Sequence, residues 1–558
     1  MIDRLPYDER GAGAMSSQSL DDEPLGPDDA SRRDDLRQSF VNVGDIIPGV
    51  SGTAASLLGK SVIIGAKGAG KTHMLRHVEA LAKEQRRHVV FCNLNQDIVA
   101  DIRHLRGTLS FEESVTLWMN VWRLVINRSL LGVFLGNSAG PKGRRAIERS
   151  DLIEASCKED KSERERLRAH FASHYPALGV ADLRSADPMS SLISVVGRYR
   201  SGASLSSALS SFDFANLEAD IAALLRGFGE VHYLIDGLDE FAPSNPRDWL
   251  DMQIGLFKLL FLWSATRDYL RRVYITITLR AYVFHHAMRD THADRVGNLV
   301  LPLTWTPNTA EEFLNRRLTG APLKGFAYSE RMTGERPLAN WLGFDTITPV
   351  GRSESEPVER YLLRHSRYSP RNVVHAVNKL CQTQNRLFLK GQSLDEDHLR
   401  AAVRLLAMYF GENLLRHVTE ELMSIIPVRA RNLRDAAHRE AAREFRLETV
   451  KDAFVECLRE CRTETCEREL LEHSILISIV PLLAGYNEQE VLRAVESVLW
   501  RSGVIAYADE NFQSGWRFAW SEGEAAHGRI LPAARRIGFH SSMIDVCGIG
   551  ATADGPVF

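Results

Sequence analysis

Residues 61 to 76 read SVIIGAKGAGKTHMLR, and this stretch decides the fold that we predict for the chain. The three apolar residues from Val62 to Ile64 are typical of a buried strand, and apolar residues between Met74 and Leu81 recur at helical spacing. Between them lies the pattern Gly-x-x-x-x-Gly-Lys-Thr, which runs from Gly65 to Thr72. A strand, a glycine-rich loop and a helix in this order predict a phosphate-binding loop rather than a chance glycine-rich turn.

The chemistry of phosphate binding explains the residue types in this loop. Glycines let the backbone turn so that successive N–H groups point at phosphate oxygens, and the following helix adds its positive dipole end. We expect Lys71 to contact the β- and γ-phosphates of a nucleotide, and the Thr72 hydroxyl to bind the accompanying Mg²⁺. The predicted nucleotide-binding residues of the loop are Gly65, Ala66, Lys67, Gly68, Ala69, Gly70, Lys71, Thr72 and His73.

Composition limits the class of protein. The chain has 558 residues, of which 44% are hydrophobic and 25% charged, as expected for a globular protein of about three domains. A net charge of −3 gives no overall attraction to nucleic acid or anionic lipid. The longest apolar runs, 255–265 and 475–485, are too short to span a bilayer, and the N-terminus does not resemble a secretion signal. Seven scattered cysteines favour a reducing, cytoplasmic location.

A second decisive stretch, residues 231 to 241, reads VHYLIDGLDEF. An apolar strand that ends in a carboxylate places Asp236 at the carboxyl edge of a parallel sheet, where nucleotide sites form. We expect Asp236 to bind Mg²⁺ beside Thr72; without the upstream loop, an acidic turn in solvent would be an equal alternative. Asp239 or Glu240 would orient or deprotonate the attacking water, and we favour Glu240.

Three further buried strands complete the predicted sheet, at 89–94, 273–280 and 298–303. The strand 273–280 contains Thr278 and ends at Arg280, which we expect to detect the γ-phosphate, although a strand-end arginine is often simply solvated. The predicted fold class is α/β. It comprises a P-loop NTPase parallel sheet flanked by helices, a helical lid, and a mostly helical C-terminal region that ends in a winged-helix-like unit.

Changes of pattern along the chain suggest its domain boundaries. Residues 1–38 are acidic and polar and are expected to form a disordered tail. The other predicted units are a P-loop core at 39–305 with a helical insertion at about 105–227, a helical lid at 306–394, a helical region at 395–487, a winged-helix-like domain at 488–545 and a tail at 546–558. Trp118 and Trp122, four residues apart, are expected to pack in a core rather than form a ligand platform. Thr309 and Glu312 are expected to form the capping box of a helix at 310–318.

Taken together, the glycine-rich loop, the sequence Leu-Ile-Asp-Gly-Leu-Asp-Glu around Asp236 and the strand ending at Arg280 resemble the P-loop NTPases of the AAA+ and STAND group. This group includes NACHT-type and KAP-type ATPases. Residues 359–374 resemble the Pro-Arg segment that opens a lid helix in such ATPases, which implies that Arg371 contacts the γ-phosphate when the lid closes. The AAA+ pattern has its catalytic Glu where this chain has Gly237, which favours the STAND-like pattern. The resemblance covers roughly residues 40–385.

The C-terminal region is predicted to be mainly helical, with amphipathic patterns at 399–410 and 414–426. Cys457, Cys461 and Cys466 are four and five residues apart, and this spacing fits a helix better than a zinc site.

Residues 488–520 read as a helix, a strand at 504–507, a turn and a strand at 516–520, which is the order of the last helix and wing of a winged helix. This helix carries Arg493 and Arg501 together with Glu488, Glu490 and Glu496. The mixed charge favours packing or protein contact over DNA binding.

From these patterns we predict an ATP-binding and ATP-hydrolysing protein in which the nucleotide, with Mg²⁺, acts as a conformational or assembly switch. The resemblance implies bacterial regulation or anti-phage defence, with self-association or a separate effector protein. Arg289 and Arg295 are candidates to act on the nucleotide of a neighbouring subunit. Two alternatives remain: a DNA-handling AAA+-like ATPase, such as a loader or transposition regulator, and a nucleotide-binding scaffold that does not hydrolyse. The motifs do not distinguish ATP from GTP.

Overall fold

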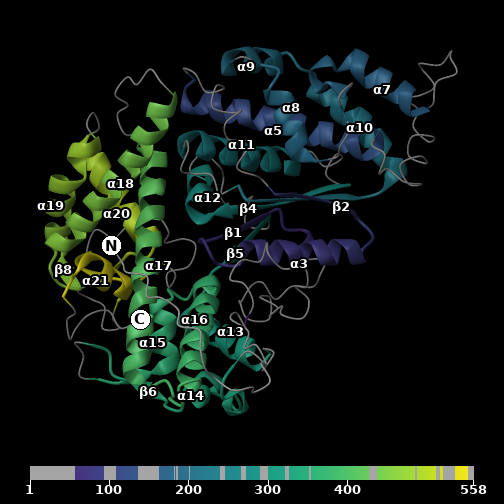
Figure 1. The fold of residues 1–558 in the computed structure, drawn as a ribbon. Helices are drawn as coiled ribbons and strands as arrows, with labels where there is room; N and C mark the ends of the chain where they lie inside the picture. The colour runs from purple at the N-terminus through teal and green to yellow at the C-terminus, as the bar shows by residue number, and fades with distance from the viewer. Residues whose placement is uncertain are drawn as a thin grey trace.

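A computed structural model describes Leu25 and the ranges 57–93, 109–135, 163–180, 183, 187–199, 201–238, 246–265, 272–288, 299–320, 326–350, 354–426, 436–483, 487–509, 516–519 and 534–550. Within these ranges the chain is α/β, with a five-stranded, all-parallel sheet and helices on both of its faces (Figure 1). The predicted fold class is therefore confirmed at this level.

The central sheet is built from the five strands that the sequence predicts, each within two residues of the expected ends. They are β1 (Val62–Gly65), β2 (His88–Asn93), β3 (Val231–Asp236), β4 (Val273–Arg280) and β5 (Val300–Leu303). The strand order is β2-β3-β4-β1-β5, and every neighbouring pair is parallel. Strand β3 is buried along its whole length, which explains its continuous apolar sequence.

The strand order creates a crevice at the carboxyl edge of the sheet. The chain leaves β1 toward the β2 side and leaves β4 toward the β5 side, so the connections of these neighbouring strands run toward opposite edges of the sheet. Ligands of open α/β sheets bind at such switch points. In the register Gly65 lies beside Arg280 and Ile63 beside Thr278, so the glycine-rich loop and the end of β4 border this crevice.

Different helices cover the two faces of the sheet. Helix α3 (Lys71–Glu84) contacts β1 to β4 on one face, and α5 (Phe111–Leu135) and α11 (Pro246–Ala265) cover the other (Figure 1). Trp118 and Trp122 are buried in the core that α5 shares with the sheet, as predicted. No helix within the described ranges has the length and apolarity to cross a membrane.

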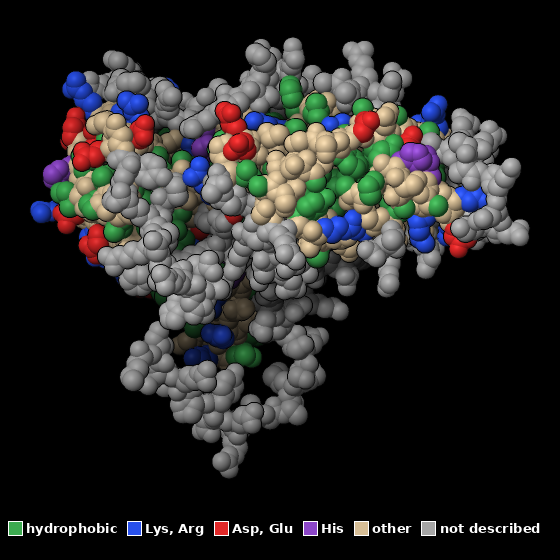
Figure 2. Space-filling model, turned by 90° about the horizontal axis from the view of Figure 1, so that it is seen from above, with side chains coloured by type: hydrophobic (Ala, Val, Ile, Leu, Met, Phe, Trp, Pro, Cys, Tyr) green, Lys and Arg blue, Asp and Glu red, His purple; other side chains and the backbone are tan. Residues whose placement is uncertain are grey.

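The interval predicted as a helical insertion contains α5, α7 (Glu163–His174), η4 (Pro176–Leu178), α8 (Pro188–Val196), α9 (Gly202–Ser210) and α10 (Phe214–Phe228). Arg128 of α5 joins two of these segments, because its guanidinium donates to the Leu178 carbonyl at 2.8 Å and to Ser191 Oγ at 3.1 Å. Figure 2 views the molecule from this side: apolar side chains gather in the middle of the face, and charges of both signs lie around them.

The chain beyond β4 first forms α12 (Ala281–Met288), which packs on α11, and later a second group of helices below the sheet (Figure 1). The elements of this group are α13 (Pro307–Thr319), η9 (Ser329–Arg331), α14 (Pro337–Leu342), β6 (Thr346–Ile347), β7 (Glu356–Pro357), α15 (Val358–His365) and α16 (Pro370–Phe388). Leu25, within the predicted disordered tail, is buried here, where its N–H donates to Asn378 Oδ1 at 3.1 Å.

The predicted start of α13 was wrong by three residues. Its N-cap is Thr306, whose side chain pairs with Thr309 in a capping box, so Thr309 is the third helical residue and not the cap. Pro307 explains the difference, because proline suits the first position of a helix, where its missing N–H costs nothing.

The C-terminal region is organised around α17 (Glu396–Ile425), a single helix of 30 residues that joins the two predicted amphipathic stretches. It lies beside α11, α16, α18, α20 and α21. The remaining elements are α18 (Ala436–Glu460), β8 (Thr465–Glu467), α19 (Arg468–Ser478), η10 (Val480–Leu483), α20 (Glu488–Arg501), β9 (Ile505–Asp509), β10 (Ala534–Phe539) and α21 (Ser541–Cys547).

Two predictions in this region need correction. Cys466 lies in strand β8 and not in a helix with Cys457, because the chain leaves α18 at Glu460. The predicted strand at 516–520 is reduced, within the described residues 516–519, to one bridge between Tyr507 and Arg517. The main partner of β9 is β10, whose sequence ARRIGF lacks the apolar continuity that would have revealed it.

The crossing of α5 and α11 depends on a glycine, which gives a first prediction. A Cβ at Gly255 would lie 2.6 Å from Trp118 Cβ and 2.8 Å from the Met119 backbone nitrogen. Alanine normally stabilises a helix relative to glycine, but here overpacking should make Gly255→Ala less stable by about 1–3 kcal/mol. Urea unfolding measures this, with Ser264→Ala on the exposed side of α11 as the control. A Gly255→Ala protein as stable as the parent would contradict the close approach of the two helices.

A buried histidine between β3 and β4 gives a second prediction. His232 Nε2 lies 2.9 Å from Thr276 Oγ1, and burial, with a smaller contribution from Arg87, lowers the pKa of His232 to about 3. Below about pH 6.5 the unfolded chain therefore binds a proton that the folded chain excludes. The free energy of unfolding should decrease as the pH is lowered through this range. At pH 5.5 the loss from this site should be about 1 kcal/mol relative to neutral pH.

Urea unfolding between pH 7.5 and 5.5 tests the assignment of this pH dependence. Over this pH range the free energy of unfolding of His232→Gln should decrease less than that of the parent, by about the amount lost from this site. Parallel curves would show that His232 does not cause the dependence.

Candidate functional site

The glycine-rich loop between β1 and α3 has the backbone that its sequence requires. Gly68 and Gly70 have φ angles of 83° and 91°, in the left-handed region that favours glycine. Lys71 is buried at the start of α3, where its ammonium donates to the carbonyls of Gly65 at 3.3 Å and Ala66 at 3.1 Å. The positive charge is thereby held within the curve of the loop. Trp305 fixes the far side, because its Nε1 donates to the Ala69 carbonyl at 2.9 Å.

The ends of β3 and β4 supply the next pair of predicted residues. Asp236 is buried, and its Oδ1 accepts a hydrogen bond from Thr278 Oγ1 at 2.7 Å. Thr278 in turn lies beside Ile63 on β1, so β4 connects the carboxylate to the strand that precedes the loop. Gly237 follows with a φ of 73°, which turns the chain at the end of the strand.

The oxygen donors at this edge suit Mg²⁺. The Asp236 carboxylate and the Thr72 hydroxyl are hard ligands, and Mg²⁺ is usually bound by one or two such groups together with water and substrate phosphates. Among the residues that the structure describes, no cluster of three or more His, Cys, Asp or Glu side chains could hold a metal. Asp236 and Thr72 would supply two oxygen ligands to such an ion.

The N-terminus of α16 packs directly on the loop. The Arg371 N–H donates to the Gly68 carbonyl at 3.3 Å, and a Cβ at Gly68 would lie 2.5 Å from Ser369 Oγ. Ser369 occupies the N-cap of α16 without capping it, and its buried hydroxyl has no hydrogen-bond partner in the described structure. A buried hydroxyl and the positive end of a 19-residue helix thus face the glycine-rich loop, and both would stabilise an anion.

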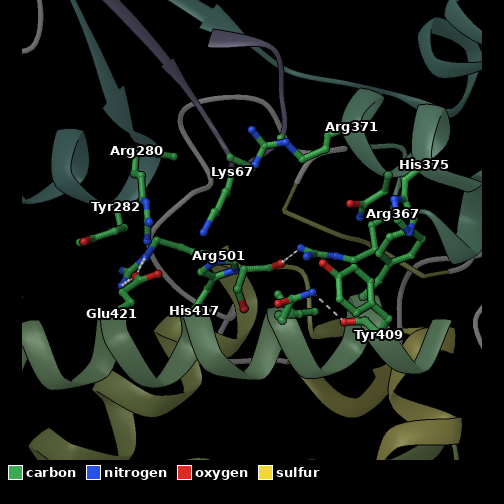
Figure 3. A pocket seen from close by; sticks show the side chains of 18 residues that line it. Lys67, Arg280, Tyr282, Arg367, Arg371, His375, Tyr409, His417, Glu421 and Arg501 are labelled. Carbon is green, nitrogen blue, oxygen red and sulfur yellow. Dashed lines mark hydrogen bonds and ion pairs between the residues drawn. The ribbon is translucent and has the colours of Figure 1, made fainter. Parts of the chain in front are cut away.

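A cavity of about 290 Å³ opens beside this contact (Figure 3). It lies between the loop, the end of β4, the start of α16, α17 and the end of α20. Its cationic lining residues are Lys67, Arg280, Arg367, Arg371 and Arg501. Glu421 also lines the cavity, so cationic groups outnumber carboxylates in the wall and favour a multiply charged anion.

Buried ion pairs connect this cavity to the C-terminal helices. Arg501 donates to Glu421 Oε1 through Nη2 at 2.6 Å and through Nε at 3.0 Å, and both side chains are buried. Burial raises the pKa of Glu421, although the positive charges of Arg501 and Arg280 oppose this change. A looser pair joins Arg280 Nη1 to Glu420 Oε2 at 3.7 Å. Helix α17 is therefore joined both to the end of β4 and to α20.

A strained turn between α15 and α16 makes a further connection. Arg367 and Tyr368 have φ angles of 58° and 52°, which cost non-glycine residues about 1–3 kcal/mol each. Arg367 Nη2 donates to the Ser502 carbonyl at 2.5 Å, beyond the end of α20, and burial lowers the pKa of Arg367 to about 10. The turn thus contacts the C-terminal unit, while the residues that follow it contact the loop.

The structure brings most predicted site residues to one edge of the sheet, whereas Asp239, Glu240, Arg289 and Arg295 lie outside the described residues. Sequence reasoning missed Ser369, Arg367, Glu420, Glu421 and the inward role of Arg501. Ser369 could have been found, because it stands at the N-cap position before Pro370. Glu420 and Glu421 gave no comparable signal, since acidic residues are common on the polar face of a helix.

Comparison with known proteins adds no family to this geometry: the chain matches no family model and no curated protein. The inference of function therefore rests on the arrangement at the carboxyl edge of the sheet.

The Arg501–Glu421 pair gives a third prediction. Leaving one member of a buried ion pair without its partner should cost about 3–5 kcal/mol, so Glu421→Leu and Arg501→Met should each be strongly destabilising. The double variant should be more stable than either single one, because it leaves no buried charge uncompensated. Denaturant unfolding of all four proteins measures the coupling.

The matched control is the exposed pair of Arg316 and Glu312 on α13, whose coupling should be at most about 1 kcal/mol. Additive effects at residues 421 and 501 would contradict a direct pair between them.

Proposed function

We propose that this protein binds ATP with Mg²⁺ and hydrolyses it, and that the nucleotide switches the arrangement of α16 and α17 around the glycine-rich loop. The observation that carries the proposal is the contact of Ser369 and Arg371 with Gly68, at the edge where Lys71 and Asp236 also lie. A buried hydroxyl without a partner in the described structure and two helix N-termini, those of α3 and α16, favour a negatively charged group at this edge. A polyphosphate supplies it.

In this proposal each residue has a defined task. The N–H groups of the loop and the Lys71 ammonium bind the β- and γ-phosphates, and Thr72 and Asp236 hold the Mg²⁺, which neutralises phosphate charge when bound. Arg280 and Arg371 contact the γ-phosphate from the strand and the helix. Of the two carboxylates after β3, we retain Glu240 as the group that orients the attacking water.

The sheet supports the resemblance to P-loop NTPases of the AAA+ and STAND group. The strand before the loop and the strand ending in Asp236 are separated by β4, so Thr278 and Arg280 enter between the loop and the carboxylate. We assign α13 to α16 as the lid and the β8-β10-β9 sheet with α20 as a winged-helix-like unit. A role in bacterial regulation or defence, through self-association or an effector protein, follows only from the resemblance.

The switch would operate through competition for arginines. Arg280 pairs with Glu420 at 3.7 Å, and a γ-phosphate, which carries more negative charge than one carboxylate, would compete for this arginine with α17. Arg367, in the strained turn, donates to the Ser502 carbonyl, and Arg371, four residues later, donates to the Gly68 carbonyl. Together they connect the loop with Ser502. Loss of the γ-phosphate would return Arg280 to Glu420 and change the contact between α17 and the sheet.

The charges of α20 favour this switch over the DNA-handling alternative. Arg501 is paired with Glu421, and Glu496 accepts hydrogen bonds from Arg468 at 2.9 and 2.8 Å. These charges are therefore neutralised by partners within the molecule. On the face in Figure 2, acidic and basic side chains are intermixed rather than gathered in a basic stripe. The scaffold alternative would use the same nucleotide site, and it differs from the switch only in that it would not hydrolyse ATP.

The fourth prediction separates these functions. Lys71→Ala should weaken ATP binding roughly 10- to 100-fold, because it removes charge-assisted contacts with phosphate, whereas Lys83→Ala at the exposed far end of α3 should bind normally. Glu240→Gln should bind ATP but release phosphate much more slowly. Calorimetric titration and phosphate release, each with and without DNA, measure both properties.

Three results would count against the proposal. Equal ATP affinity in Lys71→Ala and Lys83→Ala would overturn the site. Tight binding without any phosphate release would favour the scaffold, and DNA-stimulated release would favour the DNA-handling ATPase.

A further inference from the structure

A second cavity lies away from the glycine-rich loop, between α15, the first half of α17 and α21. Its volume is about 1070 Å³, at the upper end of the range of small-molecule sites. Tyr361 and Arg364 line it from α15, Leu405 and Met408 from α17, and Ser541 and Ile544 from α21. Three elements that are distant in sequence thus form one concave wall.

The wall combines exposed apolar side chains with a buried hydroxyl. Leu405 and Met408 are one helical turn apart and unusually exposed for such residues, at 66% and 38%. Ser541 is 2% exposed, and its hydroxyl has no hydrogen-bond partner in the described structure, although a buried hydroxyl without one is costly. A ligand in the cavity would cover the apolar side chains of Leu405 and Met408.

The charged residues of the wall are mostly cationic. Arg364, Arg400 and Arg404 line the cavity, and Asp397 is the carboxylate that lines it. Arg364 is held by two hydrogen bonds to Glu356 Oε1, at 2.9 and 2.6 Å, and Arg400 pairs with Glu396 at 2.6 Å and with Asp397. Arg404 adds a further positive charge one turn along α17 from Arg400. The wall therefore combines an apolar surface with an arginine cluster.

We propose that this cavity is an effector site for an amphipathic organic anion, a small molecule with an apolar body and one carboxylate, sulfonate or phosphate group. The apolar body would lie on Leu405, Met408 and Ile544, and the anionic group would lie near Arg404. Helix α17 continues from this cavity to Tyr409, His417 and Glu421, which line the cavity beside the glycine-rich loop (Figure 3).

The ligand and the nucleotide would therefore act on one helix, and their affinities would be coupled reciprocally. This coupling rests on the proposed nucleotide function, but the ligand site itself does not.

Fluorescence titration of the full-length protein with 1-anilinonaphthalene-8-sulfonate, without nucleotide, tests the site. One molecule should bind per chain, and Leu405→Asp and Arg404→Ala should each weaken binding about tenfold, the first by loss of apolar contact and added repulsion. Leu389→Asp is the matched control, because Leu389 is also largely exposed, at 77%, and lies outside the cavity. N-phenyl-1-naphthylamine, which lacks the sulfonate, should bind at least about tenfold more weakly.

Equal affinity of the anionic dye for Leu405→Asp and Leu389→Asp would overturn the site. Equal affinity of the parent for the anionic and the neutral dye would overturn the preference of the site for anions. ATP with Mg²⁺ should shift the dye affinity severalfold in the parent but not in Lys71→Ala. A parent protein that binds both ligands without such a shift would overturn the coupling alone. Failure of the parent to bind ATP in a separate titration would overturn the proposed function and leave the dye site standing.

Discussion

The arrangement of the site depends on the absence of a side chain at residue 68. Because Gly68 has no Cβ, Ser369 and Arg371 approach the loop closely enough for the Arg371 N–H to bond the Gly68 carbonyl. This approach fixes the start of α16 over the loop, and the strained turn at Arg367 and Tyr368 carries the chain there. Strained backbone persists only where surrounding contacts compensate for it, and here the loop and the Ser502 carbonyl supply those contacts.

The same region concentrates buried charge, which is costly unless each group is neutralised nearby. Glu420 and Glu421 on α17 face Arg280 and Arg501, and these two pairs join the C-terminal helices to the edge of the sheet. The two pairs differ in closeness: Arg501 makes two hydrogen bonds to one oxygen of Glu421, at 2.6 and 3.0 Å, whereas the Arg280 pair is longer, at 3.7 Å. The proposed switch uses this difference, because the longer pair would be the easier one for an added anion to break.

The sequence predicted the parallel sheet well because each of its strands carries a local signal. Asp236 and Thr278 could be placed at one edge from their strands alone, and a hydrogen bond now joins them. Elements without such a signal were missed. Strand β10, with two arginines and a glycine, is recognisable only beside β8 and β9, and Arg501 has the pattern of a surface charge unless Glu421 is known to lie opposite it. The Arg501 and Glu421 side chains are 80 positions apart in the chain, so no local pattern encodes their pairing.

The continuity of α17 has a mechanical consequence. Thirty residues at 1.5 Å each make a rod of about 45 Å, and no proline or break interrupts it. Glu420 and Glu421 lie near one end, and Arg400 and Arg404 lie near the other. A rotation of about 5° at the end beside the sheet would displace the opposite end by roughly 4 Å. In the proposed switch, the helix would therefore act as a lever that converts a small shift of one arginine into a larger displacement of a distant surface.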